Sequence, residues 1–217
     1  MRTLRSSLVC VLTVVLVASA VAARGQGEPG AKAVPLFNGK TLDGWEGDPK
    51  IFRVEDGAIV AGTLANKIAR NEFLCTTRTF GDFELRLKFK LLGGDGANAG
   101  VQFRTKRIPN NHEVSGYQAD MGVGWWGALY DESRRNKVLI GPDQTKMKDV
   151  IKLNDWNDYV IRAEGTRIQQ WVNRFQTVDY TEQDAGIDQA GVICVQIHGG
   201  PPSEAWYKDI TIVDLTK

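Results

Sequence analysis

The sequence has few of the residues from which metal centres are built, since its 217 residues include three cysteines and two histidines. None of them shows the spacing of a Cys/His metal site. Charge is balanced, with 27 Lys and Arg against 26 Asp and Glu, so no basic field points to nucleic acid or to an anionic membrane. Helical periodicity is also nearly absent. These gaps exclude a zinc module and a basic nucleic-acid-binding domain, and they disfavour a helical fold.

The first residues have the pattern of a secretory signal peptide. Arg2 and Arg5 precede an apolar run over residues 8–17, and small residues follow as far as Ala23. This run is shorter than the roughly 20 apolar residues that span a bilayer. We therefore expect cleavage after residues 1–23, a secreted or periplasmic protein, and no membrane span in the mature chain.

The mature chain is predicted to have a short flexible leader over residues 24–34, rich in Gly and charge, and one domain over residues 35–217. Two cysteines remain after cleavage, Cys75 and Cys194, in a compartment that permits a disulfide. Both lie in apolar, strand-like runs, so a bridge and two buried free thiols are both compatible with the sequence.

Short strand-like runs separated by turn signals fill the rest of the chain. Asp56-Gly57 and Glu164-Gly165 each lie between two such runs and predict hairpins. Apolar residues alternate with charged ones over residues 83–90, as in a strand with one buried face. Gly93–Gly96 lacks the Lys-Ser/Thr of a phosphate loop and is expected to be a tight loop. The pattern predicts an all-β fold, a two-sheet antiparallel sandwich or jelly roll, with one helical turn or two near residues 131–136.

Three of the predicted strands carry polar pairs at i, i+2, on the face opposite to their apolar residues. The pairs are Gln102 and Arg104, Gln118 and Asp120, and Gln196 and His198. If the strands are neighbours in one sheet, these side chains form a polar platform. Asn98 begins the first strand, and Trp125, Trp126 and Tyr130 follow the second, with Asp131 and Glu132 expected on the same rim. Amides, a guanidinium, a carboxylate and an imidazole beside indoles are typical of carbohydrate sites.

An ordered set of motifs resembles one known family, the 3-keto-disaccharide hydrolases, over residues 36–215. The motifs are Leu36–Trp45, Phe52–Ile59, Phe83–Leu85, Asn98–Arg104, Gly116–Asp120, Trp156–Asn157, Gln196–His198 and Trp206–Ile210. The resemblance implies a concanavalin A-like (laminin G-like) jelly roll. It also implies action on sugars whose C3 hydroxyl has been oxidised to a ketone.

Two positions depart from the pattern of that family. Ala99 stands where many members have Ser, and Gln118 stands where many have Glu. The second change replaces a potential acid or base by an amide. Gln118 is therefore compatible with a different mechanism or with a protein that only binds sugar.

The implied substrate suggests roles for the platform residues. A ketone at C3 acidifies the C2 proton, so a base can form an enolate that expels the C1 group, and water then adds to the enone. His198 is a candidate base, and Asp120 is either the base or the group that orients His198. Arg104 can stabilise the enolate oxygen or pair with Asp120 in a structural role. Gln102, Gln118, Gln196, Asn98 and Tyr130 can bind hydroxyls, and Trp125 or Trp126 can stack on the ring.

No cofactor is certain from the sequence, although the nearby acids and imidazoles, including His112 and Glu113, leave a divalent cation possible. The leading hypothesis is a secreted enzyme that cleaves 3-keto-glycosides, with a small carbohydrate as its partner. A non-catalytic lectin-like module is the alternative; Gln118 in place of Glu favours it, and the set of His198, Asp120 and Arg104 argues against it. An ordinary retaining glycosidase needs two carboxylates about 5 Å apart, and no strand carries the Glu-x-Asp-x-Glu pattern of that class.

Overall fold

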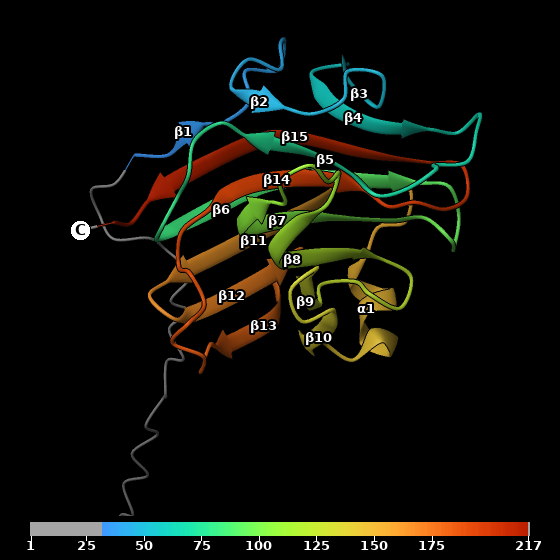
Figure 1. Cartoon of the computed structure of the whole chain (residues 1–217). Coiled ribbons are helices and arrows are strands. Elements are labelled where there is room, and N and C mark those ends of the chain that lie inside the picture. The colour runs from blue at the N-terminus through green and yellow to red at the C-terminus, as the bar shows by residue number, and fades with distance from the viewer. Residues whose placement is uncertain (1–31, 217) are drawn as a thin grey trace, which may run out of the picture.

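The structure, a computed structural model, describes residues 32–216, which form two antiparallel β-sheets packed face to face (Figure 1). The predicted signal peptide and most of the predicted leader lie outside the described residues. Within residues 32–216, no helix is long and apolar enough to cross a membrane.

The first sheet, sheet A, is built around the long central strands β6 and β15. Its order is β13 (Phe175–Thr181), β12 (Arg167–Val172), β11 (Asn157–Glu164), β6 (Phe83–Leu92), β15 (Ser203–Asp214), β4 (Ala58–Thr63) and β3 (Phe52–Glu55). Strand β1 (Val34–Pro35) pairs with β15 and so places Val34, the last residue of the predicted leader, in the folded domain.

The second sheet, sheet B, has the order β10 (Lys137–Ile140), β9 (Leu129–Glu132), β8 (Val114–Gly122), β7 (Asn98–Arg107), β14 (Val192–Ile197), β5 (Glu72–Thr76) and β2 (Trp45–Glu46). The helix α1 (Gln144–Val150) lies beside β9 and β10 (Figure 1). The all-β, two-sheet antiparallel sandwich predicted from the sequence is confirmed.

Local sequence explains most of these elements. Asp56 and Gly57 have φ values of 47° and 73°, the left-handed geometry of a two-residue hairpin turn, and they join β3 to β4 as predicted. The second predicted hairpin joins β11 to β12. The apolar residues of β6 face those of β7 across the sandwich, with the rings of Phe83 and Phe103 edge to face at 6.1 Å.

The predicted helical turn at residues 131–136 is wrong. Asp131 is buried, and its carboxylate accepts hydrogen bonds from Arg134 and Arg135. Ser133 and Asn136 have positive φ angles, which a helix does not allow. These contacts fold the segment into the turn of the β9–β10 hairpin. The helix is α1, which begins after Asp143 because the Asp143 carboxylate caps the amide of Thr145 at 2.9 Å.

The two cysteines that the sequence left open are bridged. Cys75 on β5 lies directly opposite Cys194 on β14, and a disulfide joins them. Both residues are fully buried on the face of sheet B that points away from the main core, where they pack with Phe73 and Val114. The bridge therefore ties together two neighbouring strands on the same face of sheet B as Gln102 and Gln196.

Candidate functional site

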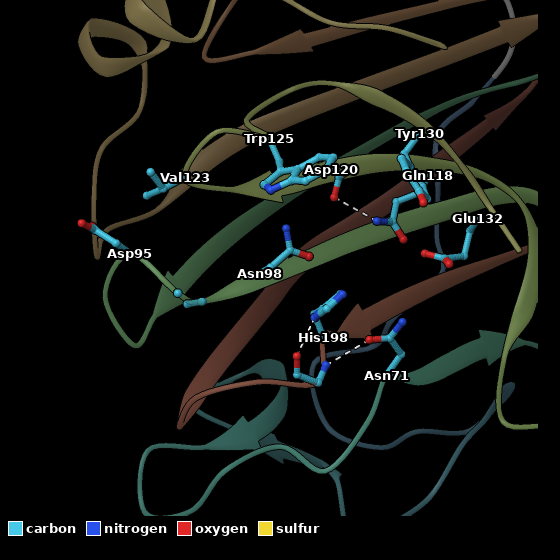
Figure 2. A pocket seen from close by; sticks show the side chains of 13 residues that line it. Asn71, Asp95, Asn98, Gln118, Asp120, Val123, Trp125, Tyr130, Glu132 and His198 are labelled. Carbon is cyan, nitrogen blue, oxygen red and sulfur yellow. Dashed lines mark hydrogen bonds between the residues drawn. The ribbon is translucent and has the colours of Figure 1, made fainter. Parts of the chain in front are cut away.

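The main cavity, of about 380 Å³, lies on the face of sheet B that points away from sheet A (Figure 2). Its wall combines polar and apolar groups and comes from strands and from the loops at one end of them. The lining residues are Asn71, Asp95, Gly96, Ala97, Asn98, Gln118, Asp120, Val123, Trp125, Tyr130, Glu132, His198 and Gly199.

The cavity floor is the polar platform that strand alternation predicts. Strands β8, β7 and β14 are neighbours, so Gln118 lies opposite Gln102, and Gly100 lies between Asp120 and Gln196. Gly100 is needed for this arrangement, because a Cβ there would lie 2.7 Å from the side-chain carboxamide carbon of Gln118. The absence of a side chain at position 100 lets the Gln118 amide lie across β7.

Asp120 is the most unusual ionisable group of the cavity. It is 2% exposed, and burial raises the pKa of its carboxyl to about 7, with a smaller contribution from the nearby Glu132 charge. Hydrogen bonds from Gln118, at 2.9 Å, and from Asn98 oppose this shift. A carboxyl group that titrates near neutral pH can accept a proton and return it.

Glu132 is a second carboxyl group with a raised pKa. Burial raises it to about 7, and the charges of Glu113 and Asp131 add to that effect. Glu132 lines the cavity, as expected for the rim, whereas Asp131 alternates to the other face of β9. The charge of Glu132 raises the pKa of the Asp120 carboxyl, so an ionised Glu132 disfavours ionisation of Asp120.

His198 lies just beyond the end of β14, on the side of the cavity opposite to β8. Its backbone amide donates to the Asn98 carbonyl at 3.0 Å, and its Nδ1 lies 2.7 Å from the Gly199 carbonyl. A carbonyl only accepts, so Nδ1 carries a hydrogen and Nε2 is left for a ligand. Asn71 supports this corner, since its Oδ1 accepts from the Gly199 amide at 3.0 Å (Figure 2).

Two aromatic side chains form the opposite rim. Trp125 is exposed, and its ring lies edge to face with that of Tyr130 at 6.2 Å between centroids. Burial raises the pKa of Tyr130, so its hydroxyl stays protonated and can donate to a ligand. An exposed indole beside polar groups can stack on a sugar ring.

Arg104 does not reach this cavity, which corrects its predicted place on the platform. Its guanidinium is buried and donates to the carbonyls of Gly81 and Gly165 and to the Asp82 carboxylate, at 3.1, 2.6 and 2.8 Å. The cause is an irregularity in β7, where the register shifts after Phe103 and Arg104 has a φ of 46°. Arg104 thus joins sheet B to the turns beside β6 and between β11 and β12, and it does not pair with Asp120.

Replacing Arg104 with methionine is expected to reduce stability without altering the site. Loss of a buried, fully hydrogen-bonded cation should lower the free energy of unfolding by about 3 kcal/mol. Chemical denaturation measures this change, and kcat/KM of the folded variant should stay within about twofold of wild type. A large loss of kcat/KM with unchanged stability would contradict this account and show that Arg104 acts directly in the active site.

Three other predicted residues also lie outside the cavity lining. Gln102 and Gln196 are on the platform face but fully buried, and the Gln102 amide donates to Gln118. Trp126 is buried and stacks on Phe89 in the core, because the tight turn over residues 122–127 sends its indole to the opposite side from Trp125. These side chains support the site and do not contact a ligand in the cavity.

Sequence reasoning missed several lining residues. Asn71 precedes β5, Asp95 lies in the glycine-rich loop, and Val123 begins the turn after β8. All lie in loops, where strand periodicity carries no information. For Asp95, the signal in the sequence was its position between glycines, which marks a tight loop where a side chain can face a cavity. Within residues 32–216, no group of three or more His, Cys, Asp or Glu side chains is arranged to hold a metal ion.

The model of the 3-keto-alpha-glucoside-1,2-lyase-like domain family matches residues 32–213. No similar sequence was found among curated proteins.

Several solved structures share the fold. A Parabacteroides distasonis structure described as a candidate glycosyl hydrolase has a TM-score of 0.63 and 20% identity, covering 85% of this chain and 94% of its own. The carbohydrate-binding module CBM66 from Bacillus subtilis has a TM-score of 0.61 and 13% identity, and the match covers 79% of this chain and 96% of the module. A Bacillus licheniformis β-glucanase has a TM-score of 0.56 and 11% identity, and the match covers 88% of this chain and 100% of the glucanase. At these identities the likeness shows a shared jelly-roll fold and no more.

Proposed function

The chain belongs to the 3-keto-alpha-glucoside-1,2-lyase-like domain family, and from that premise we propose that the cavity on sheet B cleaves 3-keto-glycosides. The observation that carries the proposal is Asp120, a buried carboxyl group whose pKa of about 7 suits the removal of an acidified C–H proton. The proposal includes a location outside the cytoplasm, for which the support is the predicted signal peptide and the buried disulfide.

The spacing of Asp120 and His198 fits one sugar ring between them. Asp120 lies on β8, and His198 follows β14, with β7 between these strands. Two strand spacings separate their backbones by roughly 10 Å across the sheet, and His198 lies two residues beyond Gln196, the residue level with Asp120. Figure 2 shows Asn98 in the gap between them. A pyranose over Asn98 would meet the carboxyl group on one side and the imidazole on the other.

The reaction then proceeds by elimination and hydration. The Asp120 carboxylate takes the C2 proton, and the C3 oxygen becomes an enolate. As the enolate collapses, the C1–O bond breaks and its electron pair leaves with the aglycone, which takes a proton from Nε2 of the imidazolium form of His198. Water adds to C1 of the enone and gives a proton to the imidazole, and Asp120 returns its proton to C2. The Gly199 carbonyl keeps Nδ1 protonated through both steps.

The developing enolate needs donors other than Arg104. The Tyr130 hydroxyl is one, because it stays protonated. The Asn71 amide lies on the opposite, His198 side of the cavity, where its oxygen accepts from Gly199 and its Nδ2 hydrogens can bind a hydroxyl of the sugar. A preorganised neutral donor such as the Tyr130 hydroxyl stabilises a developing oxyanion.

Gln118 fits this mechanism better than the family's usual glutamate would. Its Nε2 donates to Asp120 and its oxygen accepts from Gln102, so the amide holds the base in place. A carboxylate at this position would add a third negative charge beside Asp120 and Glu132. The amide therefore keeps Asp120 able to ionise near neutral pH.

The activity is tested by incubating the mature protein with a 3-keto-glucoside and with its unoxidised parent, and by following aglycone release. We expect release from the keto sugar alone. Release from both would indicate an ordinary glycosidase. Binding without release from either would indicate a lectin-like module.

The acidic side of the pH profile should depend on Glu132. The base must be ionised, so kcat/KM of wild type should rise as the pH passes about 7. Glutamine at position 132 removes a charge that raises the pKa of Asp120, so the midpoint of the rise should move to lower pH. The measurement is kcat/KM from pH 5 to 9 for wild type and Glu132→Gln. Complete loss of activity at every pH would identify Glu132 as the base instead.

A further inference from the structure

A second, smaller hollow adjoins the main cavity at the end where the loops meet. It has a volume of about 60 Å³ and shares Asp95 and Val123 with the cavity. The rest of its wall consists of Leu91, Gly94, Trp126, Leu153 and Asn154. Because two side chains border both spaces, a ligand that fills the cavity can extend into the hollow.

Two of the apolar side chains that line the hollow are exposed to solvent. Leu153 is 66% exposed and Val123 is 46% exposed, and the exposed Trp125 stands on the cavity side of the same loop. The two residues come from separate segments, the loop before β11 and the turn after β8. Their meeting at the cavity mouth makes one apolar surface out of two otherwise unrelated loops.

The chemistry of the hollow differs from that of the cavity. Its wall contains one ionisable group, the Asp95 carboxylate, and one side-chain amide, that of Asn154. The cavity has amides, carboxyl groups and an imidazole. The hollow therefore offers few partners for the hydroxyls of a second sugar, and no cation for an anionic group. An uncharged apolar group gives up the fewest hydrogen bonds to water when it enters the hollow, so its binding there costs the least desolvation free energy.

We infer that this hollow binds the aglycone of the substrate, and that the preferred aglycone is an uncharged aromatic or aliphatic group and not a second sugar. The inference rests on the proposed function, because the 3-keto sugar must occupy the cavity for the aglycone to reach Leu153 and Val123. The two residues are specificity determinants and take no part in proton transfer.

The test compares kcat/KM for benzyl and methyl 3-keto-glucosides of one anomeric configuration, together with a 3-keto-disaccharide. Benzyl alcohol and methanol are leaving groups of similar basicity, so a difference between them reports binding of the ring. We expect the benzyl substrate to be preferred by about tenfold over both others. Leu153→Asn should remove most of this preference and leave the methyl substrate unaffected, because Leu153 lines the hollow and not the cavity.

Leu64→Asn is the matched control, because Leu64 is 51% exposed and lines neither space. It should leave all three kcat/KM values unchanged. Equal turnover of benzyl and methyl substrates, or a preference for the disaccharide, would overturn the inference while the proposed function stands. Failure to cleave any of the three would overturn both.

Discussion

Replacing Asp120 with asparagine is expected to lower kcat for aglycone release from a 3-keto-glucoside by roughly a thousandfold, the usual scale for loss of a general base. Asparagine keeps the shape of the side chain and an oxygen that can accept from Gln118, so sugar binding should persist. The measurement is kcat from the release assay, with the substrate Kd from calorimetry.

Stability separates this effect from misfolding. The pKa of the Asp120 carboxyl is raised by folding, so its ionisation destabilises the folded state as the pH rises above the usual aspartate range. The variant should therefore be at least as stable as wild type at pH 8. Asp209→Asn is the matched control, because Asp209 lies on β15 of sheet A and its φ of 54° suits asparagine. Activity within tenfold of wild type in Asp120→Asn would remove Asp120 from the role of base.

Removing the disulfide is expected to have the largest effect on stability. Cys75 and Cys194 are 119 residues apart in sequence, so the bridge closes a long loop in the unfolded chain. Alanine at both positions should lower the free energy of unfolding by about 4 kcal/mol. Urea denaturation of the protein from residue 24 onward measures this change under non-reducing conditions.

A thiol titration provides the independent check on the bridge. The denatured, unreduced protein from residue 24 onward should show no free thiol, and it should show two after reduction. Two thiols before reduction would mean that the cysteines are free. A loss of less than about 1 kcal/mol in the double variant would mean that the bridge constrains little.

The sequence predicted the platform because side-chain direction in a strand has a period of two. Gln118 and Asp120 share a face with Gln102 and Gln196 for this reason, and β8, β7 and β14 are indeed neighbours. Arg104 broke the rule because β7 is irregular at that residue. An irregularity of this kind depends on pairing across the sheet, which alternation along one strand does not encode.

The loops were predictable only in part. Adjacent Trp125 and Trp126 look equivalent in the sequence, yet the turn that contains them directs one to the cavity and the other to the core. Asn71 and His198 lie near each other only because β5 and β14 pair. The amide of Gly199, the residue after His198, donates a hydrogen bond to the Asn71 side chain. Such contacts join residues far apart in the chain and leave no local pattern.

The central claim is that Asp120 cleaves the glycosidic bond by removing the C2 proton. The most direct test uses a 3-keto-glucoside deuterated at C2, with product analysis by mass spectrometry in ordinary water. Wild type should release the aglycone more slowly from the deuterated substrate. Its sugar product should lose deuterium, beyond the exchange seen without enzyme, to the extent that the Asp120 carboxyl exchanges with water before it protonates C2. Full retention of the deuterium at C2, with an unchanged rate, would show that the bond is cleaved without elimination and would contradict the account.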